Sequence, residues 1–554
     1  MATTPTSRAS LADLISMISR ADLPNRQKQE LTSAVRTVAR VIGSQPEQIP
    51  ADPSALRRRL DEVAPEASGI SRGRWANVRS LLTKALALTR PMLPGRSLQP
   101  ILPAWAAMMA ALSTKRRKSL GPLTRFLSAR GFSPRDVTLE DLLAYRDAML
   151  GERLRRRPEL TWDLLIWNWN FCMREVAGWP QIEIARQSRK ETYVLPWSTF
   201  PESFKADVDA YLDRLSGRDL SDDGPPRPAR PSTLATREHQ MRVCASALVH
   251  RGVDAATIRS IGDLVVLNHY QEILRFFLDR NDGQTSSQIG QIAGVLKDVA
   301  RHWVKIEDEA LAKMKRIVGR LAQHNHGMTA KNRSRLRPLD DPETVRLFLS
   351  IPERIRADVE KDKRPPDLKA VQAQMAAAIA ILQAAPIRRK NLAALDVREH
   401  LIDRGGKLYL IIAGEDVKNH EPVDFELPPH AANILVWYVR QYRPHLLKGN
   451  DGPLFPGESG GPKSGGTLGV QISKAVFRYT GLKFNVHLFR HASGKIFLDA
   501  RPGQYEVVRR VLGHRSIATT TSIYTGAETR AAGQHFAAVI AERRAKIEVK
   551  GGRR

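Results

Sequence analysis

Cysteine is nearly absent from this chain of 554 residues, in which Cys172 and Cys244 are the only two. Such a pair gives no disulfide framework and no cysteine-based zinc site, which is typical of a protein kept in a reducing compartment. Long apolar runs are missing too: no stretch of about 18 apolar residues occurs, and the first twenty residues lack the apolar core of a secretion signal. We therefore expect a soluble, cytoplasmic protein with no membrane partner.

Acidic residues are scarce relative to basic ones. The sequence has 58 Asp and Glu against 87 Lys and Arg, a formal net charge of +29. So large an excess favours a polyanionic partner, and nucleic acid before membrane. The apolar fraction of 42% argues against wholesale disorder. At roughly 100 to 200 residues per domain, the chain is expected to hold three to five domains.

The order of patterns along the chain predicts tandem helical units followed by one larger domain. Apolar residues recur at three- and four-residue spacing up to about residue 330, with little period-2 alternation. A stretch rich in proline and charge reads as a linker. The predicted units are an N-terminal helical unit at 1–95, a second helical unit with an extension at 98–215, the linker at 216–231, a third helical domain at 232–325, and a C-terminal domain at 335–554.

Runs of basic residues punctuate the first two helical units. Each run alone is more often a solvated helix face than a phosphate contact. Together, on helical units, they predict a clamp that follows the backbone of duplex DNA. The residues in these runs are Arg57, Arg58, Arg59, Lys115, Arg116, Arg117, Lys118, Arg155, Arg156 and Arg157.

Residues able to carry out chemistry gather late in the chain, between 487 and 526. His487 and Arg490 stand three residues apart, so that on a helix they share one face and can address a single oxyanion. A predicted helix over 504–512, with its valines and Leu512 inward, is stopped by Gly513 in the left-handed conformation. His514 follows it, and Ser516 can cap the next helix.

That next helix carries Tyr524. Because the phenol has a pKa near ~10, Tyr524 is a poor nucleophile unless cations stabilise the phenolate. Two further cations lie upstream. Arg388 occupies a short interruption between two apolar helices, and Lys418 lies at the tip of a β-hairpin predicted from 407–414 and 421–428.

The order of these residues resembles the catalytic domain of the tyrosine recombinases, the phage-integrase family of DNA breaking and joining enzymes. The resemblance covers about 335–545, and 232–325 is similar, less specifically, to the core-binding domain of that family. It implies a fold that is mainly α with a small β-hairpin or sheet in the catalytic domain. The matching residues, in order, are Arg388, Lys418, His487, Arg490, His514 and Tyr524.

Three positions depart from the common family pattern. Tyr524 lies ten residues after His514, where many members have nine. Asn391 stands where many carry an acidic residue, and Pro386 precedes the first arginine where glycine is common. These departures bear on the subfamily more than on the chemistry.

The resemblance implies a reaction that uses no cofactor and no metal. Tyr524 would attack a scissile phosphate to form a 3′-phosphotyrosyl link, while Arg388 and Arg490 hold the nonbridging oxygens. Lys418 would protonate the 5′-oxygen, His487 would assist proton transfer from the tyrosine, and His514 would hydrogen-bond the phosphate. His491 and Arg389 adjoin this set, and packing or capping is the role expected of both.

The function predicted first is a site-specific recombinase of a mobile element, an integrase or transposase. The expected partners are double-stranded DNA in the nucleoid, further copies of the chain (a dimer to a tetramer on DNA), and accessory recombination proteins. A short amphipathic helix around Phe536, Val539 and Ile540 is expected to dock on a neighbouring copy. A resolvase of chromosome or plasmid dimers, a relaxing topoisomerase, and a non-catalytic DNA-binding regulator with the same fold stay open as alternatives.

Overall fold

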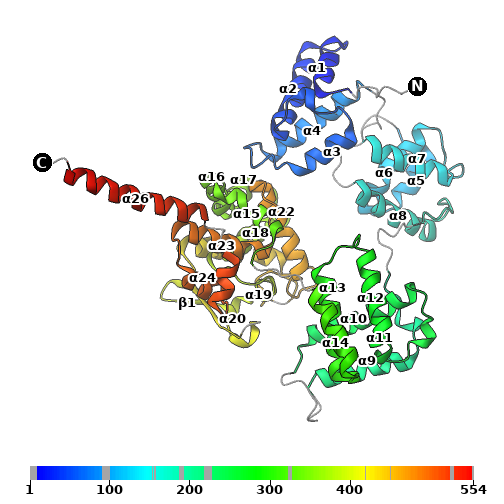
Figure 1. Cartoon of the computed structure of the whole chain (residues 1–554). Coiled ribbons are helices and arrows are strands. Elements are labelled where there is room, and N and C mark those ends of the chain that lie inside the picture. Colours follow the sequence, from blue (N-terminus) through cyan, green and yellow to red (C-terminus); the bar gives the residue numbers. More distant parts are fainter. Residues whose placement is uncertain are drawn as a thin grey trace, which may run out of the picture. The chain divides into compact units, whose positions relative to one another are not determined.

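Helices dominate the computed structural model of the chain, which Figure 1 traces from α1 to α26. The structure describes residues 9–89, 100–152, 154, 158–185, 193–217, 228–321, 327–417, 420–449, 451–524 and 529–551. The chain divides into two compact units, one of residues 187–325 and one of residues 1–186 with 326–554. The predicted fold class, mainly α with a small sheet, is confirmed.

The first helices share one apolar core. Leu14, Val35, Leu56 and Leu82 are fully buried in it. The first helix begins at a capping box, in which the Ser10 and Asp13 side chains satisfy each other's backbone N–H groups. The helices of this group are α1 (Leu11–Arg20), α2 (Asn25–Ile42), α3 (Pro53–Glu62) and α4 (Arg72–Leu86).

A second core is built on tryptophan. The Trp179 ring lies edge-on to Trp105 and Trp169, with ring centroids 5.6 and 5.2 Å apart. The indole N–H of Trp169 donates to the Ile182 carbonyl oxygen at 2.8 Å, so the segment after the last helix is fixed to the core. The helices are α5 (Pro103–Ala110), α6 (Thr114–Ala129), α7 (Leu139–Glu152) and α8 (Pro158–Glu175).

The third core includes a helix that the sequence reading assigned to the second unit. Phe204 and Val208 of α9 are fully buried in the cluster that holds α10 and α12. Asp207 also accepts hydrogen bonds from the Ile261 backbone N–H and the Trp303 indole. The third helical unit therefore begins before the predicted linker, of which 218–227 lies outside the described residues. Its helices are α9 (Glu202–Leu215), α10 (Pro231–His250), α11 (Ile261–Val265), α12 (Leu267–Asp279), α13 (Ser287–Val299) and α14 (Asp308–Leu321).

The C-terminal domain is organised around α18 (Pro366–Ala384), an alanine-rich helix with most of its residues buried. Small side chains let α17, α21, α22 and α23 pack directly against it. The other helices of this domain are α15 (Ala330–Leu336), α16 (Pro342–Leu349), α17 (Ile351–Lys361), α19 (Arg389–Ala394), α20 (Val397–His400), α21 (Pro429–Gln441), α22 (Gly465–Thr480), α23 (Val486–Ala500), α24 (Tyr505–Leu512), α25 (Ile517–Tyr524) and α26 (Thr529–Gly551).

The predicted hairpin is part of a three-stranded antiparallel sheet in the order β1-β2-β3. β2 (Lys407–Ile412) and β3 (Val423–Glu426) pair as predicted, with Leu410 opposite Phe425. β1 (Leu401–Arg404) was not predicted. It joins β2 through Gly405 and Gly406, whose φ angles of 61° and 80° form the tight turn that twisted strands favour.

Candidate active site

Arg490 is the centre of the candidate site. It lies on α23, the predicted helix of His487 and Arg490, which begins after Asn485, whose side chain accepts from the Leu488 N–H. The guanidinium is 7% exposed, and its Nη1 donates to the Pro386 carbonyl oxygen at 2.6 Å. Its Nη2 donates to the carbonyl oxygen of Leu512. One rigid fork thus joins α23 to the residues before α19 and to the end of α24.

Arg388, Arg490 and His514 line one cleft of about 160 Å³. Arg388 is half-buried as the N-cap residue of α19, in the interruption that the sequence predicts. Burial, and then the charge of Arg388, lowers the pKa of Arg490 to about 10, which keeps Arg490 protonated at neutral pH. Within the described ranges Arg490 donates to backbone carbonyl oxygens and pairs with no carboxylate. The positive charges of Arg388 and Arg490 therefore repel each other, and an anion between them would relieve that repulsion.

His514 enters this cleft from the end of α24. Gly513 adopts φ 57°, the left-handed conformation predicted for the helix stop. The His514 ring nitrogen Nδ1 is 2.9 Å from the hydroxyl oxygen of buried Thr520. Burial, followed by the charges of Arg490 and Arg388, lowers the pKa of His514 to about 4, so the ring is neutral at pH 7.

Tyr524 contacts the backbone of Arg490 but does not line the cleft. Its side chain is fully buried at the end of α25, which the Ser516 side chain caps as predicted. The phenol donates to the Arg490 carbonyl oxygen at 3.2 Å, and Nδ1 of His491 is 3.5 Å from the phenol oxygen. Burial raises the pKa of Tyr524 above its ordinary value, and the charge of Arg490 opposes that rise.

Gly494 makes room for the Tyr524 ring. A Cβ at position 494 would come within 2.6 Å of Cζ and 2.7 Å of the phenol oxygen. Such approaches are far inside van der Waals contact, so any larger residue would displace the tyrosine. Gly494 lies one turn after Arg490 on α23, and the two residues both contact the phenol.

Two histidines extend from Tyr524 toward the start of α23. The rings of His487 and His491 meet edge-on with centroids 4.9 Å apart, and His491 meets the Tyr524 ring at 6.1 Å. Burial, then the charge of His487, lowers the pKa of His491 to about 4. The pKa of His487 is also lowered, by burial of the ring and by Arg490 and Arg388, although the residue remains solvent-exposed.

Lys418 lies outside the described residues. Val417, directly before it, and Glu421, three residues after it, both line the cleft of Arg388 and Arg490. The connection between β2 and β3 therefore borders the cleft on both sides of position 418. The role of Lys418 stays a prediction.

The basic runs do not form one uniform surface. Arg58, Lys115, Arg117 and Lys118 are exposed on their helices. Arg57 donates to the Leu150 carbonyl oxygen, and the Arg116 guanidinium lies 3.5 Å from the centre of the Phe171 ring. Arg59 is half-buried on α3, and Arg155, Arg156 and Arg157 lie outside the described residues. DNA contact by these runs stays a prediction.

Sequence reasoning missed two residues of the site and misplaced two others. Thr520 contacts His514 and Gly494 lies against Tyr524, and the only sequence signal for either was a distance of four residues from a recognised residue. His491, which was expected to pack beside the site, contacts Tyr524. On α24, Val508 and Leu512 are buried as predicted, whereas Val507 and Val511 are exposed. Only one narrow face of this eight-residue helix is buried, and that face includes Val508 and Leu512 but not the other two valines.

Two further properties concern only the described part of the chain. No group of three or more His, Cys, Asp and Glu side chains there could hold a metal ion. No helix there combines the length and apolar character needed to cross a bilayer.

Comparison with known proteins gives one similar sequence and several solved structures. No family model matches the chain. A tyrosine recombinase XerC from Methylobacterium sp. (strain 4-46) is 34% identical over 228 residues, which is 39% of this chain. The chain spans 65% of the length of that relative.

The solved structures are aligned at low sequence identity. A XerH site-specific recombinase bound to difH substrate in a pre-cleavage complex is 12% identical, with a TM-score of 0.30, over 59% of this chain and 93% of that one. XerH in a post-cleavage complex with palindromic difH is 13% identical, with a TM-score of 0.34, over 63% and 99%. A XerA recombinase is 14% identical, with a TM-score of 0.25, over 54% and 97%. These scores are too low to establish a common fold over the whole chain.

Proposed function

We propose that this chain is a member of the tyrosine recombinase family, a site-specific DNA recombinase that works through a 3′-phosphotyrosyl intermediate. The observation that carries the proposal is the convergence of Arg388, Arg490 and His514 on one cleft, with Tyr524 bonded to the backbone of Arg490. The described lining of that cleft holds four arginines and one carboxylate, Glu421. One guanidinium group can donate two parallel hydrogen bonds to a pair of phosphate oxygens, so a phosphodiester suits this cleft.

The proposed reaction exchanges one phosphoester bond for another. The phenol oxygen of Tyr524 attacks phosphorus, a bond forms between them, and the bond from phosphorus to the 5′-oxygen breaks. Arg388 and Arg490 stabilise the charge that grows on the nonbridging oxygens. Lys418 gives a proton to the departing 5′-oxygen. Because the phosphoester energy is kept in the covalent link, a 5′-hydroxyl of another strand can reverse the step without ATP.

The neutral histidines can accept the proton that Tyr524 loses. The lowered pKa values of His487 and His491 leave both rings unprotonated at neutral pH, so either can accept a proton. We assign proton transfer to His487, and His491 contacts both His487 and Tyr524. We assign Thr520 as the hydrogen-bond donor to Nδ1 of His514, an arrangement that places the ring proton on Nε2, from where it can bind a phosphate oxygen.

Tyr524 has to move before it can attack. A side chain with no exposed surface, bonded to a backbone carbonyl, cannot contact a phosphate bound in a cleft that it does not line. We therefore include in the proposed cycle a step in which α25 shifts and the phenol leaves the Arg490 carbonyl. The step loses one neutral hydrogen bond, at about 1 kcal/mol, and part of the burial of the ring, at up to about 3 kcal/mol, and DNA binding has to offset both.

Within this class we propose an integrase or transposase of a mobile element, acting as an oligomer on DNA. Two helical cores, from α1 to α8, precede the third, core-binding-like unit, and an enzyme that grips an extended end sequence has a use for them. A resolvase of chromosome or plasmid dimers is the alternative within catalysis. The DNA to which the chain is bound in its host distinguishes the two functions. Binding to element ends that flank its own gene supports the mobile-element enzyme, whereas binding to one chromosomal site supports the resolvase.

The test of the activity is covalent capture. The chain is incubated with a nicked duplex that loses its 5′-hydroxyl fragment after cleavage, so that rejoining is blocked. We expect a chelator-insensitive adduct, joined at the 3′-phosphate, that Tyr524→Phe does not form. Equal DNA binding by the wild type and Tyr524→Phe, with no adduct from either, would establish a non-catalytic DNA-binding regulator instead.

A further inference from the structure

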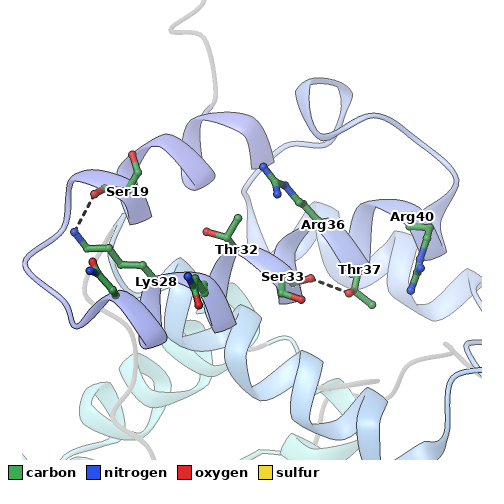
Figure 2. A pocket seen from close by; sticks show the side chains of 9 residues that line it. Ser19, Lys28, Thr32, Ser33, Arg36, Thr37 and Arg40 are labelled. Atoms are coloured by element: carbon green, nitrogen blue, oxygen red, sulfur yellow. Dashed lines mark hydrogen bonds between the residues drawn. The ribbon is translucent and has the colours of Figure 1, made fainter.

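Three grooves meet on one face of the N-terminal helical group, far in sequence from the candidate active site. The largest, of about 630 Å³, runs along α2, as Figure 2 shows. A groove of about 440 Å³ shares Gln29 and Ser33 with it, and one of about 400 Å³ shares Arg40. Arg74 of α4 lines both smaller grooves. The three grooves therefore form one continuous surface.

This surface is the polar side of an amphipathic helix. Leu31, Val35 and Val38 turn into the core on the other side of α2. The side that lines the largest groove repeats every four residues, and its members are all basic, amide or hydroxyl residues. We define the α2 face by six of them: Lys28, Gln29, Thr32, Ser33, Arg36 and Arg40.

The cations of the α2 face are available for a ligand. Arg36 and Arg40 are exposed and make no ion pair or side-chain hydrogen bond with any other described residue. Lys28 donates to a backbone carbonyl oxygen, that of Ser19, at 3.0 Å, which leaves its charge uncompensated. Glu30, the one acid of α2, lines the groove of about 440 Å³ and is paired with Arg26 at 3.3 Å. The six residues of the α2 face thus include three cations and no carboxylate.

The residue types suit a nucleic acid better than a simple anion. Arginine and lysine bind phosphates and the acceptor edge of guanine, glutamine pairs with the edge of adenine, and Ser or Thr bonds to either. A helix of 18 residues is about 27 Å long and fits a major groove of about 12 Å width. Arg74, on a neighbouring helix, can contact the phosphate backbone beside that groove.

We propose that the α2 face binds double-stranded DNA, with α2 in the major groove and Arg74 on the adjoining backbone. This inference rests on the proposed function, because it takes the bound duplex to be a segment of the recombination substrate outside the point of cleavage. The proposal assigns the contacts that recognise the DNA base sequence to α2. The basic run of α3, where Arg57 already bonds to a backbone carbonyl, is then secondary.

The test uses the full chain in the Tyr524→Phe background, so that binding does not depend on cleavage. The probe is a duplex of about 40 base pairs, selected by that chain from random-sequence DNA. The variant Arg36→Ala with Arg40→Ala is compared with Arg20→Ala with Lys84→Ala, which removes two exposed cations of the same helical group outside the three grooves. All four positions are exposed, and thermal unfolding checks that both variants keep the fold.

We expect the α2 double variant to bind the selected duplex at least about tenfold more weakly, because it loses two guanidinium contacts to base edges or phosphates. The control should stay within about threefold, as expected for charge outside the interface. Gln29→Ala should alter the selected sequence at one position. Affinities of the two double variants that agree within twofold would overturn the proposal, as would a loss seen only with duplex RNA. Adduct formation by the wild type is scored separately, so its failure would reject the proposed function and leave the α2 result standing.

Discussion

The ring of Tyr524 lies directly against Gly494, at a distance where a Cβ on residue 494 would approach the ring to 2.6 Å. The same phenol donates to the carbonyl oxygen of Arg490, one helical turn earlier. A single face of α23 therefore provides both the space and the hydrogen-bond acceptor for the tyrosine. It also ties the position of the proposed nucleophile to that of the arginine that would bind phosphate.

Gly494→Ala is expected to destabilise the C-terminal domain, although alanine is the better helix former. The Cβ would overpack against Tyr524, at a typical cost of about 1–3 kcal/mol, against about 1 kcal/mol gained in helix propensity. Urea unfolding measures the difference. Gly466→Ala is the matched control in the same domain, because a Cβ there meets only the Ser464 hydroxyl oxygen at 3.9 Å. Equal free energies of unfolding for the two variants would show that residue 494 is not closely packed against Tyr524.

His491 should make stability depend on pH between about 4 and 6.5. Its pKa in the folded chain is about 4, below the ordinary value of 6.5, so the unfolded chain binds more protons in this window. The free energy of unfolding should therefore fall as pH drops. The wild type should lose up to about 3 kcal/mol more than His491→Gln between pH 7 and 4. Denaturant unfolding across this range is the measurement, and parallel curves for the two chains would contradict it.

Arg490→Lys should impair chemistry and folding together. A single ammonium cannot reproduce the fork that reaches the carbonyl oxygens of Pro386 and Leu512. We expect adduct formation to slow by at least about 100-fold. The free energy of unfolding should fall by about 1–3 kcal/mol, because one buried acceptor loses its donor.

The control for Arg490→Lys is Arg346→Lys on α16, where the arginine is exposed and pairs with Glu343. Water screens the charges of an exposed ion pair, and lysine keeps the positive charge, so this change should leave both quantities nearly unaltered. An Arg490→Lys chain that kept full adduct formation would remove Arg490 from the proposed phosphate site.

The apolar side chains of α26 are expected to serve contacts between copies of the chain. Phe536 is 68% exposed, and Val539 and Ile540 are 41% and 42% exposed, so their own domain leaves much of this apolar surface uncovered. Phe536→Ser with Ile540→Ser should weaken the pairing of two bound DNA sites more than binding to one site. Gel shifts with one-site and two-site duplexes measure both. Deleting 533–554 should act in the same direction, and equal losses in both assays would refute this role.

The sequence by itself determined the helices that carry most of the candidate site residues. Residue type and spacing predicted the helix of His487 and Arg490, the left-handed Gly513 before His514, and the break at Arg388. These features depend on contacts within a few residues, which local patterns report. The β2–β3 pairing followed in the same way, from strict alternation in β3.

Tertiary structure alone decided where Tyr524 lies and what surrounds it. Its burial against Gly494, the hydrogen bond to Arg490, and the contact with His491 join residues on different helices, and no local pattern encodes such distances. The assignment of α9 to the third core has the same origin, since Asp207 bonds to residues more than fifty positions away. Chemistry follows from residue type, whereas proximity follows from how the helices share a core, and only the folded chain fixes that.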